Sequence, residues 1–564
     1  MRAEQPRLRV AICWHMHQPE YRQFGSGEYQ LPWTYLHAIK DYVDMAAHLE
    51  DCPDARVVVN FAPILLEQIE DYAGQVNDFL IDGHPLRDPL LEALVDTAMP
   101  SDHLKQLGLI TACLRVSRER LINRYPAYRH LAGIADWILA NGDALRYLNG
   151  QFLIDLVVWY HLAWLGETVK RTDGRIRHLL EKETGYTPED RLGLLGVIGE
   201  LLNNVLPRYR ALAERGQIEL SVTPYAHPIL PLLLDIGSAR EAMPEANMPL
   251  LEHYPGGEER ARWHIQKGLE VFQRHFGFAP AGCWPAEGGV GESCMRLLAE
   301  AGFRWAATGG NVLKNSLAVS ERESAPGPHR PYRIQDSELT CFFRDDGLSD
   351  LIGFTYSDWH ADDAVSDLIK HLETIQAVCE GNDRVVSIIL DGENAWEYYP
   401  ENGYYFLRGL YERLSAHPRI ELVTFSDCLS RIPKPMSLPR LVAGSWVYGT
   451  FSTWIGDAEK NRGWDMLGDA KRCFDRTLGR LDDKHRQAAE RQLAICEGSD
   501  WFWWFGDYNP ADVVSDFERL FRMNLANLYL MLGEKPPTYL TEVFTHGAGS
   551  PFRGGAMRPG TFTS

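Results

Sequence analysis

The chain has 564 residues, of which 45% are hydrophobic and 24% charged, as in an ordinary globular protein with a large buried core. Its 77 acidic residues against 57 basic ones give a formal net charge of −20, which would repel a nucleic acid backbone. We therefore expect no nucleic acid partner. The 10 cysteines include no C-x-x-C pair, so neither a disulfide scaffold nor a zinc knuckle is expected.

The N-terminal segment lacks the basic start and apolar core of a secretion signal, and no stretch approaches 18 uncharged apolar residues. The sequence therefore predicts a cytoplasmic protein with no membrane partner. It leaves the oligomeric state open.

Short β-branched runs alternate with helical patterns along the chain, which indicates βα units around a mostly parallel sheet. Strands are expected at residues 7–14, 55–61, 217–223, 281–284, 304–308, 351–354, 384–390 and 420–425. Between them, residues 64–73 and 292–301 carry apolar stripes at helical spacing. Seven or eight parallel strands predict a barrel of the α/β class.

The helical patterns also divide the chain. Residues from about 100 to 215 are mostly helical and indicate an insertion after the second strand, which could form a lid or wall. After about residue 430 the strand signal fades and amphipathic helices follow. We expect residues 1–430 to form a catalytic barrel, 431–545 a helical region that contributes to the cleft, and 546–564 a flexible tail rich in Gly and Pro.

Polar side chains follow several of the predicted strands, where a parallel barrel carries its active site. The first strand runs into His15 and His17, which point to one face of an extended chain. Two imidazoles so placed can bind a zinc ion, contact sugar hydroxyls, or be structural, and the sequence leaves these roles open.

Two further segments place carboxyl groups near strand ends. The third predicted strand carries Glu219 and is followed by Tyr225 and His227, and a buried Glu paired with a cation is the alternative role for Glu219. Glu287 follows Trp284 in a turn rich in Gly and Pro. Such a turn can hold a carboxylate rigidly and partly desolvated, as a nucleophile needs.

The strongest candidate is the apolar strand at 384–390, which ends abruptly at Asp391. Burial or a second carboxylate raises the pKa of a carboxyl in this position, which keeps a general acid protonated, although an Asp here can also cap a helix. Residues 498–509, GSDWFWWFGDYN, pack aromatic side chains beside two Asp and are expected to form a sugar-stacking wall or part of the core.

Two carboxylates on separate strand ends are the minimum for cleaving a glycosidic bond, one as nucleophile and the other as acid and then base. The sequence contains no P-loop, no dinucleotide-binding fingerprint, no G-x-S-x-G elbow and no H-E-x-x-H pair. Glycoside chemistry is therefore the reaction class that these residues favour.

At these residues the sequence resembles glycoside hydrolase family 57, a family of amylases, amylopullulanases, 4-α-glucanotransferases and branching enzymes. The five motifs of the family are matched in order by His17–Pro19, Gly216–Glu219, Trp284–Glu287, Asp391–Trp396 and the aromatic segment Trp501–Asp507. The resemblance runs from residue 10 to about 510. It implies a distorted (β/α)7-type barrel with a helical C-terminal region, a retaining mechanism, and neither a metal nor another cofactor in the chemistry.

The resemblance also implies roles for individual residues. It makes Glu287 the nucleophile and Asp391 the acid/base. The residues expected to bind sugar are His15, His17, Gln18, Trp33, Glu219, Tyr225, His227, Trp284, Trp359, Glu393, Trp396, Trp503 and Asp507.

The predicted function is a retaining, double-displacement enzyme acting on α-1,4-linked glucan or malto-oligosaccharide, with α-1,6 linkages left open. The first motif reads H-M-H-Q-P rather than the H-G-H of branching enzymes, which disfavours a branching activity. Residues 348–364, with Asp350, Tyr356 and Trp359, and the aromatic run at 498–507 resemble the amylase and amylopullulanase members. A 4-α-glucanotransferase on the same site is the alternative. Two other classes remain: a zinc-dependent enzyme of the α-mannosidase or deacetylase type using His15, His17 and an Asp, and a non-catalytic glucan-binding protein.

Overall fold

A computed structural model describes residues 7–96, 102–147, 149–320, 327–334, 337–378, 383–432 and 434–548. Within these ranges one sheet contains β1 Leu8–Met16, β2 Val57–Phe61, β3 Ile218–Val222, β4 Gly282–Cys283, β5 Trp305–Thr308, β6 Tyr332–Ile334, β7 Thr340–Phe343, β8 Val385–Asp391, β9 Ile420–Leu422 and β10 Met436–Leu438. The strand order is β10-β6-β7-β5-β4-β3-β2-β1-β8, and β9 pairs with the start of β1. Among these described strands, only β6 and β7 pair in antiparallel fashion.

The sheet curls into a barrel whose two ends meet. A parallel bridge joins Arg344, directly after β7, to Ser387 of β8. The backbone N–H of Asp345 also donates to the carbonyl of Ser387 at 2.8 Å. The strands β1, β2, β3, β4, β5, β7 and β8 therefore surround a common axis, and the predicted (β/α)7-type barrel is confirmed.

The barrel is filled by apolar side chains, as expected for parallel strands buried on both faces. Cys13, Val58 and Trp305 belong to this interior cluster. One end is closed by helix α19 (Phe425–Arg431), whose Phe425 ring lies 4.6 Å from that of Trp305. Because α19 follows β9, which pairs with the first residues of β1, this is the amino end of the barrel. Polar side chains can therefore gather at the carboxyl end.

The strand expected at 351–354 is wrong. Leu351–Thr355 is a π-helix that continues α16 (Asp346–Asp350). Asp345 caps α16 by accepting a hydrogen bond from the backbone N–H of Leu348 at 2.9 Å. Because the helix has already started, the short apolar run continues it, and periodicity alone cannot separate these two outcomes.

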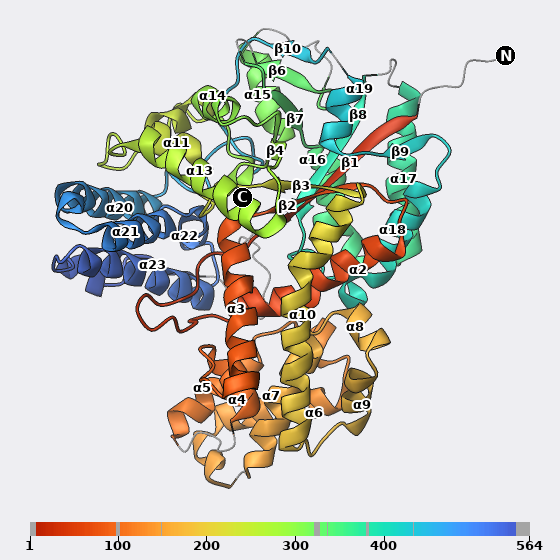
Figure 1. The fold of residues 1–564 in the computed structure, drawn as a ribbon, viewed down its shortest axis with the longest axis vertical. Helices are drawn as coiled ribbons and strands as arrows, with labels where there is room; N and C mark the ends of the chain where they lie inside the picture. The colour runs from red at the N-terminus through yellow and green to blue at the C-terminus, as the bar shows by residue number, and fades with distance from the viewer. Residues whose placement is uncertain are drawn as a thin grey trace.

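A helical extension lies between β2 and β3. It contains α3 Pro63–Asp82, α4 Pro89–Val95, α5 His103–Cys113, α6 Pro126–Ala140, α7 Gly150–Trp164, α8 Glu167–Thr172, α9 Gly174–Lys182 and α10 Pro188–Glu214. The long helices α3 and α10 pack together and run from the barrel to the group formed by the shorter ones (Figure 1). The helices expected in this part of the chain are present, and they begin already at α3.

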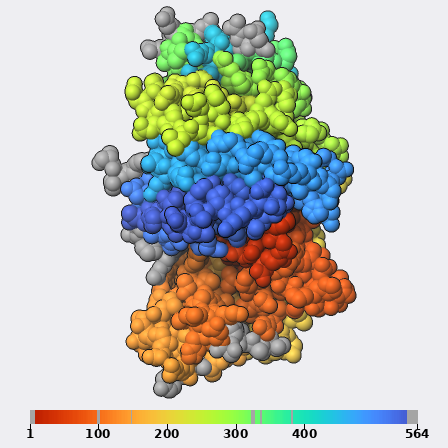
Figure 2. Space-filling view, turned by 90° about the vertical axis from the view of Figure 1, so that its left-hand side faces the viewer, coloured from red at the N-terminus to blue at the C-terminus, as the bar shows by residue number. Residues whose placement is uncertain are grey.

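The other α-helices cover the barrel or follow it. They are α1 Trp33–His37, α2 Val43–Asp51, α11 Leu230–Leu234, α12 Ala239–Ala242, α13 Gly257–Phe276, α14 Glu292–Glu300, α15 Gly310–Val319, α17 Ala361–Val378, α18 Tyr404–Ser415, α20 Ala458–Thr477, α21 Asp483–Cys496, α22 Ser499–Trp504 and α23 Ala511–Met531. The C-terminal helices form a blue band across one face, between residues coloured yellow-green and the red and orange N-terminal part (Figure 2).

Two further predictions concern the C-terminal tail and membrane-spanning helices. Most of the predicted tail, residues 549–564, lies outside the described ranges. Within those ranges, no helix is both long enough and apolar enough to cross a lipid bilayer.

Candidate active site

Glu287 lies in a tight turn directly after β4. Its backbone is in the left-handed region with φ +56°, and Gly288 follows with φ +59°. A Cβ on Gly288 would lie 2.8 Å from the indole of Trp284, so glycine is required there. Trp446 holds the residue at two points: its Nε1–H donates to Oε2 at 2.8 Å, and its backbone N–H donates to the Glu287 carbonyl at 3.1 Å. The carboxyl group therefore has a fixed direction.

Asp391 is the last residue of β8, where it pairs in register with His15 of β1. The side-chain amide of Asn394 donates to its Oδ2 at 2.8 Å. The next residue, Gly392, donates its backbone N–H to the carbonyl of His15 at 2.7 Å. These bonds fix the strand end, and Asp391 lies at the carboxyl end of the barrel, as the sequence pattern predicts.

The two carboxyl groups are coupled electrostatically. Burial, and next the charge of Asp391, raise the pKa of Glu287 well above its usual value. Burial raises the pKa of Asp391 to about 6. Because the charge of Asp391 opposes ionisation of Glu287, the pair holds one proton over a range of pH, and the shifts favour Glu287 as its site in the unliganded protein. One ionised and one protonated carboxyl is the state that acid-assisted nucleophilic attack requires.

Three buried imidazoles, His15, His17 and His227, form what we call the histidine cluster. The rings of His17 and His227 stack with centroids 3.7 Å apart, and those of His15 and His227 lie 5.1 Å apart. His15 Nδ1 contacts Asn60 Oδ1 at 2.7 Å, and His227 Nδ1 contacts Ser499 Oγ at 2.8 Å. Asn60 of β2 and Ser499 at the start of α22 therefore help to hold the rings in one stack.

The histidine cluster reaches the carboxyl pair. His227 Nδ1 lies 4.0 Å from Glu287 Oε1, and His17 Nε2 lies 2.8 Å from Asp500 Oδ1. Burial lowers the pKa of His15 to about 3 and that of His227 well below its usual value. Neutral imidazoles can both donate and accept hydrogen bonds, which suits them to sugar hydroxyls.

The zinc alternative can be tested on the same residues. One donor atom each from His17, His227 and Asp500 lies within 4.8 Å of the others, and all three side chains are buried. His15, which the sequence reading placed in the metal site, instead contacts His227 Nε2 through its own Nε2 at 3.0 Å. His17 Nε2 already bonds to Asp500, so a metal would have to replace this contact.

A cavity of about 310 Å³ lies beside Asp391. We call it the aromatic cavity because Trp446, Tyr448, Phe354 and Trp503 contribute to its walls. Of the described residues, neither Glu287 nor a member of the histidine cluster lines it. Its volume is in the range of small-molecule sites.

Gln18 and Glu393 lie buried next to His17. Gln18 Oε1 accepts from the Tyr21 hydroxyl at 2.9 Å, and Glu393 Oε1 faces the backbone N–H of His17 at 3.4 Å. Burial, and next the charge of Asp391, raise the pKa of Glu393 well above its usual value. Both side chains therefore support the loop that carries His17.

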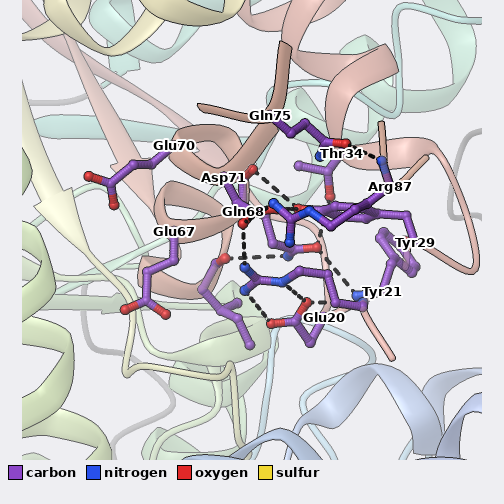
Figure 3. Close-up of polar contacts among 12 residues, drawn as sticks. Glu20, Tyr21, Tyr29, Thr34, Glu67, Gln68, Glu70, Asp71, Gln75 and Arg87 are labelled. Carbon is purple, nitrogen blue, oxygen red and sulfur yellow. Dashed lines mark hydrogen bonds and ion pairs between the residues drawn. The ribbon is translucent and has the colours of Figure 1, made fainter. Parts of the chain in front are cut away.

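The same loop is held by a polar network on α3 (Figure 3). Gln68 donates through Nε2 to the Pro19 carbonyl at 2.8 Å and accepts from the Tyr21 backbone N–H at 3.3 Å. Glu20 pairs with Arg491 of α21 at 2.8 Å. The segment after β1 is thus fixed from the helical extension and from the C-terminal helices.

Several predicted sugar-binding residues make their contacts elsewhere. Glu219 is near the amino end of the barrel, where it accepts from Trp305 Nε1 at 2.7 Å and from the Ser426 backbone N–H at 2.9 Å. These partners are neutral, whereas the alternative role predicted for Glu219 was a pairing with a cation. Trp396 is buried, and its Nε1–H donates to the Gly392 carbonyl at 2.8 Å.

Four others lie apart from the carboxyl pair or are open to solvent. Tyr225 donates its hydroxyl to Glu67 Oε2 at 2.6 Å. Trp33 lines a separate, smaller cavity. Trp359 is 42% exposed, and Asp507 is exposed. No contact of these four residues with Glu287 or Asp391 is seen among the described residues, and their roles remain predictions.

The most informative residue that the sequence reading missed is Trp446. It lies after the barrel, in a stretch whose Pro-rich pattern signals no element, and no motif spacing ties it to Glu287. Asn60, by contrast, carries a detectable signal, because it is a polar residue near the end of the apolar strand β2. The rule applied to the other strand ends would have found it.

Comparisons with known proteins agree with the resemblance found in the sequence. The model of glycosyl hydrolase family 57 matches residues 11–439. The structure is similar to a family 57 branching enzyme of Thermococcus kodakaraensis, with a TM-score of 0.58 and 14% identity over 98% of this chain and 99% of that one. It is also similar to an α-amylase of Thermotoga maritima, with a TM-score of 0.56 and 14% identity over 93% of this chain and 94% of that one.

A third similar structure is a 4-α-glucanotransferase of Thermococcus litoralis, with a TM-score of 0.51 and 16% identity over 93% of this chain and 60% of that one. At such identities these likenesses establish the fold and not the activity. A comparison with curated proteins gave no match.

Proposed function

The chain belongs to glycosyl hydrolase family 57, and from this premise we propose that it is a retaining enzyme that cleaves or transfers α-1,4-linked glucan. The observation that carries the proposal is the coupled pair of Glu287 and Asp391 at the carboxyl end of the barrel. An amylase or amylopullulanase is the leading activity, with α-1,6 linkages as a further substrate. The alternative activity is that of a 4-α-glucanotransferase that uses the same site.

In the first step Asp391 gives its proton to the glycosidic oxygen as the bond from C1 to that oxygen breaks. Glu287 forms the new bond to C1, and we assign Oε1 as the attacking atom because Trp446 engages Oε2. Positive charge developing at C1 lies against Glu287 and favours its ionised form, so the shared proton goes to Asp391.

In the second step a water molecule or a sugar hydroxyl attacks C1 of the glycosyl-enzyme. Asp391, now ionised, takes the proton of the attacking hydroxyl, and the bond between C1 and Glu287 breaks. Both carboxyl groups return to their starting states. Water gives hydrolysis, whereas a sugar hydroxyl gives transfer.

The histidine cluster is placed to hold the hydroxyls of the sugar that reacts at C1, because His227 lies next to Glu287 Oε1. We also propose that residues 431–545 complete the catalytic unit formed by residues 1–430. Trp446 and Asp500, which contact Glu287 and His17, both come from this C-terminal part.

The product profile from maltoheptaose tests this function, with Glu287→Gln beside the wild-type protein. Shorter oligosaccharides alone indicate a hydrolase, and longer ones in addition indicate a glucanotransferase. The variant is expected to be nearly inactive in both cases. Maltoheptaose untouched by the wild-type protein would overturn the proposal.

A zinc-dependent enzyme is the second candidate, because donor atoms of His17, His227 and Asp500 lie close together. Metal analysis of the purified protein, combined with turnover before and after chelation, separates the two. Bound zinc and loss of turnover with chelator would favour this candidate. Turnover that survives chelation supports the carboxyl pair, and any turnover removes the non-catalytic glucan-binding alternative.

A further inference from the structure

The aromatic cavity touches only one member of the carboxyl pair. Asp391 forms part of its wall, whereas Glu287 is not among the described residues that line it and lies 4.0 Å from His227. In a retaining mechanism the acid lies on the side of the departing sugar, and the nucleophile attacks from the opposite face. The cavity therefore lies where the sugar leaves and where the next acceptor enters.

The walls of the cavity include large aromatic side chains that do not serve the core. Phe354 is 55% exposed and Tyr448 is 63% exposed. Phe354 lies on the π-helix Leu351–Thr355, an arrangement found often at functional sites. Flat apolar rings beside open space can stack on the face of a sugar ring.

Tyr448 is held in an unfavourable backbone conformation at this position. Its φ is +57°, which is rare for a residue with a side chain. Its loop is fixed at several points: Ser445 donates its hydroxyl to the Thr450 carbonyl at 2.7 Å, and Asn315 donates to the Gly449 carbonyl at 3.1 Å. The loop thus presents Tyr448 to the cavity next to Trp446.

The charged groups of the cavity identify the kind of occupant. Arg344 bonds to Asp346 at 3.0 Å and to Asp350 at 2.7 Å, so its charge is already balanced. Asp391 adds another carboxyl to the same walls. An anion would therefore be repelled, whereas the hydroxyls of a neutral sugar can donate hydrogen bonds to carboxylates.

We infer that the aromatic cavity binds the departing and the accepting sugar, and that Phe354 and Tyr448 stack on it. This inference rests on the proposed function. It assigns the choice between hydrolysis and transfer to these two aromatic residues, and it specifies a neutral saccharide, rather than inorganic phosphate, as the acceptor.

Two donors test the inference, because they differ only in what leaves. Maltoheptaose loses a sugar, which must occupy the cavity, whereas α-maltosyl fluoride loses fluoride, which needs no stacking surface. Phe354→Ala and Tyr448→Ala are expected to lower kcat/KM on maltoheptaose by about tenfold each. Fluoride release from α-maltosyl fluoride is expected to change by less than about twofold. Phe24→Ala, which removes another exposed ring (48%) outside the cavity, serves as the matched control.

A second experiment measures transfer to an added acceptor. With α-maltosyl fluoride as donor and maltose added, the two variants should give less transfer product relative to hydrolysis than the wild type and Phe24→Ala. Inorganic phosphate in place of maltose should give no glycosyl phosphate, and its formation would overturn the neutral acceptor.

The remaining outcomes distinguish a failure of the inference from a failure of the proposed function. If both variants act on maltoheptaose as well as the wild type does, or lose fluoride release to the same extent, the inference is overturned while the proposed function stands. If the wild-type protein acts on neither donor, the proposed function fails and the inference fails with it.

Discussion

The two sides of the carboxyl pair are built differently. Next to the pair, the histidine cluster is buried, stacked, and held by hydrogen bonds to Asn60, Ser499 and Asp500. On the Asp391 side, Phe354 and Tyr448 are more than half exposed and lie on a π-helix and a loop. The difference indicates that the covalent step needs fixed geometry, whereas the exchange of one sugar for another needs an open surface.

The largest effect is expected at the group that the two sides share. Asp391→Asn removes the proton donor without changing the size of the side chain, and kcat on maltoheptaose should fall by about 10²–10⁴-fold. The loss should be smaller on α-maltosyl fluoride, because fluoride needs less help to leave. Equal losses on both donors would contradict the role of Asp391 as the acid.

The pH dependence tests the shared proton. Because the pKa of Asp391 is about 6, the pair carries two protons below that pH and Glu287 has no charge with which to attack. We expect kcat/KM to fall with decreasing pH, about tenfold per unit below pH 6. At high pH it should fall again, when the last proton leaves. A flat profile from pH 7 to pH 4.5 in protein that stays folded would contradict this coupling.

The bond from Trp446 tests how firmly the nucleophile is held. Trp446→Phe removes the donor to Glu287 Oε2, and a hydrogen bond to a charged group is worth enough to reduce kcat by about tenfold or more. The pKa of Glu287 should rise further, since this bond favours its ionised form. The pH profile of kcat/KM, measured beside kcat, reports both changes.

A matched control exists in Trp454. Its buried Nε1 has no hydrogen-bond partner among the described residues. Trp454→Phe therefore makes the same chemical change without touching Glu287, and it should leave the pH profile in place. The same shift in both variants would mean that the change is structural.

The smallest effect is expected at Gln68, which supports the segment that carries His17. Gln68→Leu leaves the Pro19 carbonyl and the Tyr21 N–H without their partner, which should lower the free energy of unfolding by about 1–3 kcal/mol. KM for maltoheptaose should rise because the segment that carries His17 loosens. Gln75→Leu on the same helix, which loses a bond to the Arg87 N–H, should lower stability without raising KM. A normal KM in Gln68→Leu would show that this support is not needed.

The sequence predicts one side of the site better than the other, for a physical reason. Glu287 follows β4, and Asp391 and His15 lie at the carboxyl ends of β8 and β1. Parallel strands bring these ends together by geometry alone. Glu219 shows the limit of that rule, since it is the second residue of β3 and so lies at the opposite end of the barrel. Its place within the strand was a usable signal.

Trp446 and Tyr448 belong to a loop after the barrel, and nothing in the strand pattern places that loop over Glu287. Their position is set by tertiary contacts, such as the pairing of Gly444 with Val290, that no local spacing encodes. The wrong strand at 351–354 has a similar origin, because the cap by Asp345 decided between helix and strand. The acceptor side is therefore the part that required a structure.

The most direct test of the central claim is to trap the glycosyl-enzyme. A 5-fluoro α-glucosyl fluoride reacts with the nucleophile, loses fluoride, and forms an intermediate that hydrolyses slowly. Mass spectrometry of digested protein should find the added sugar on Glu287, in the wild type and not in Glu287→Gln. An adduct on another residue, or turnover of this donor to a product of inverted configuration with no adduct, would contradict the retaining pair of Glu287 and Asp391.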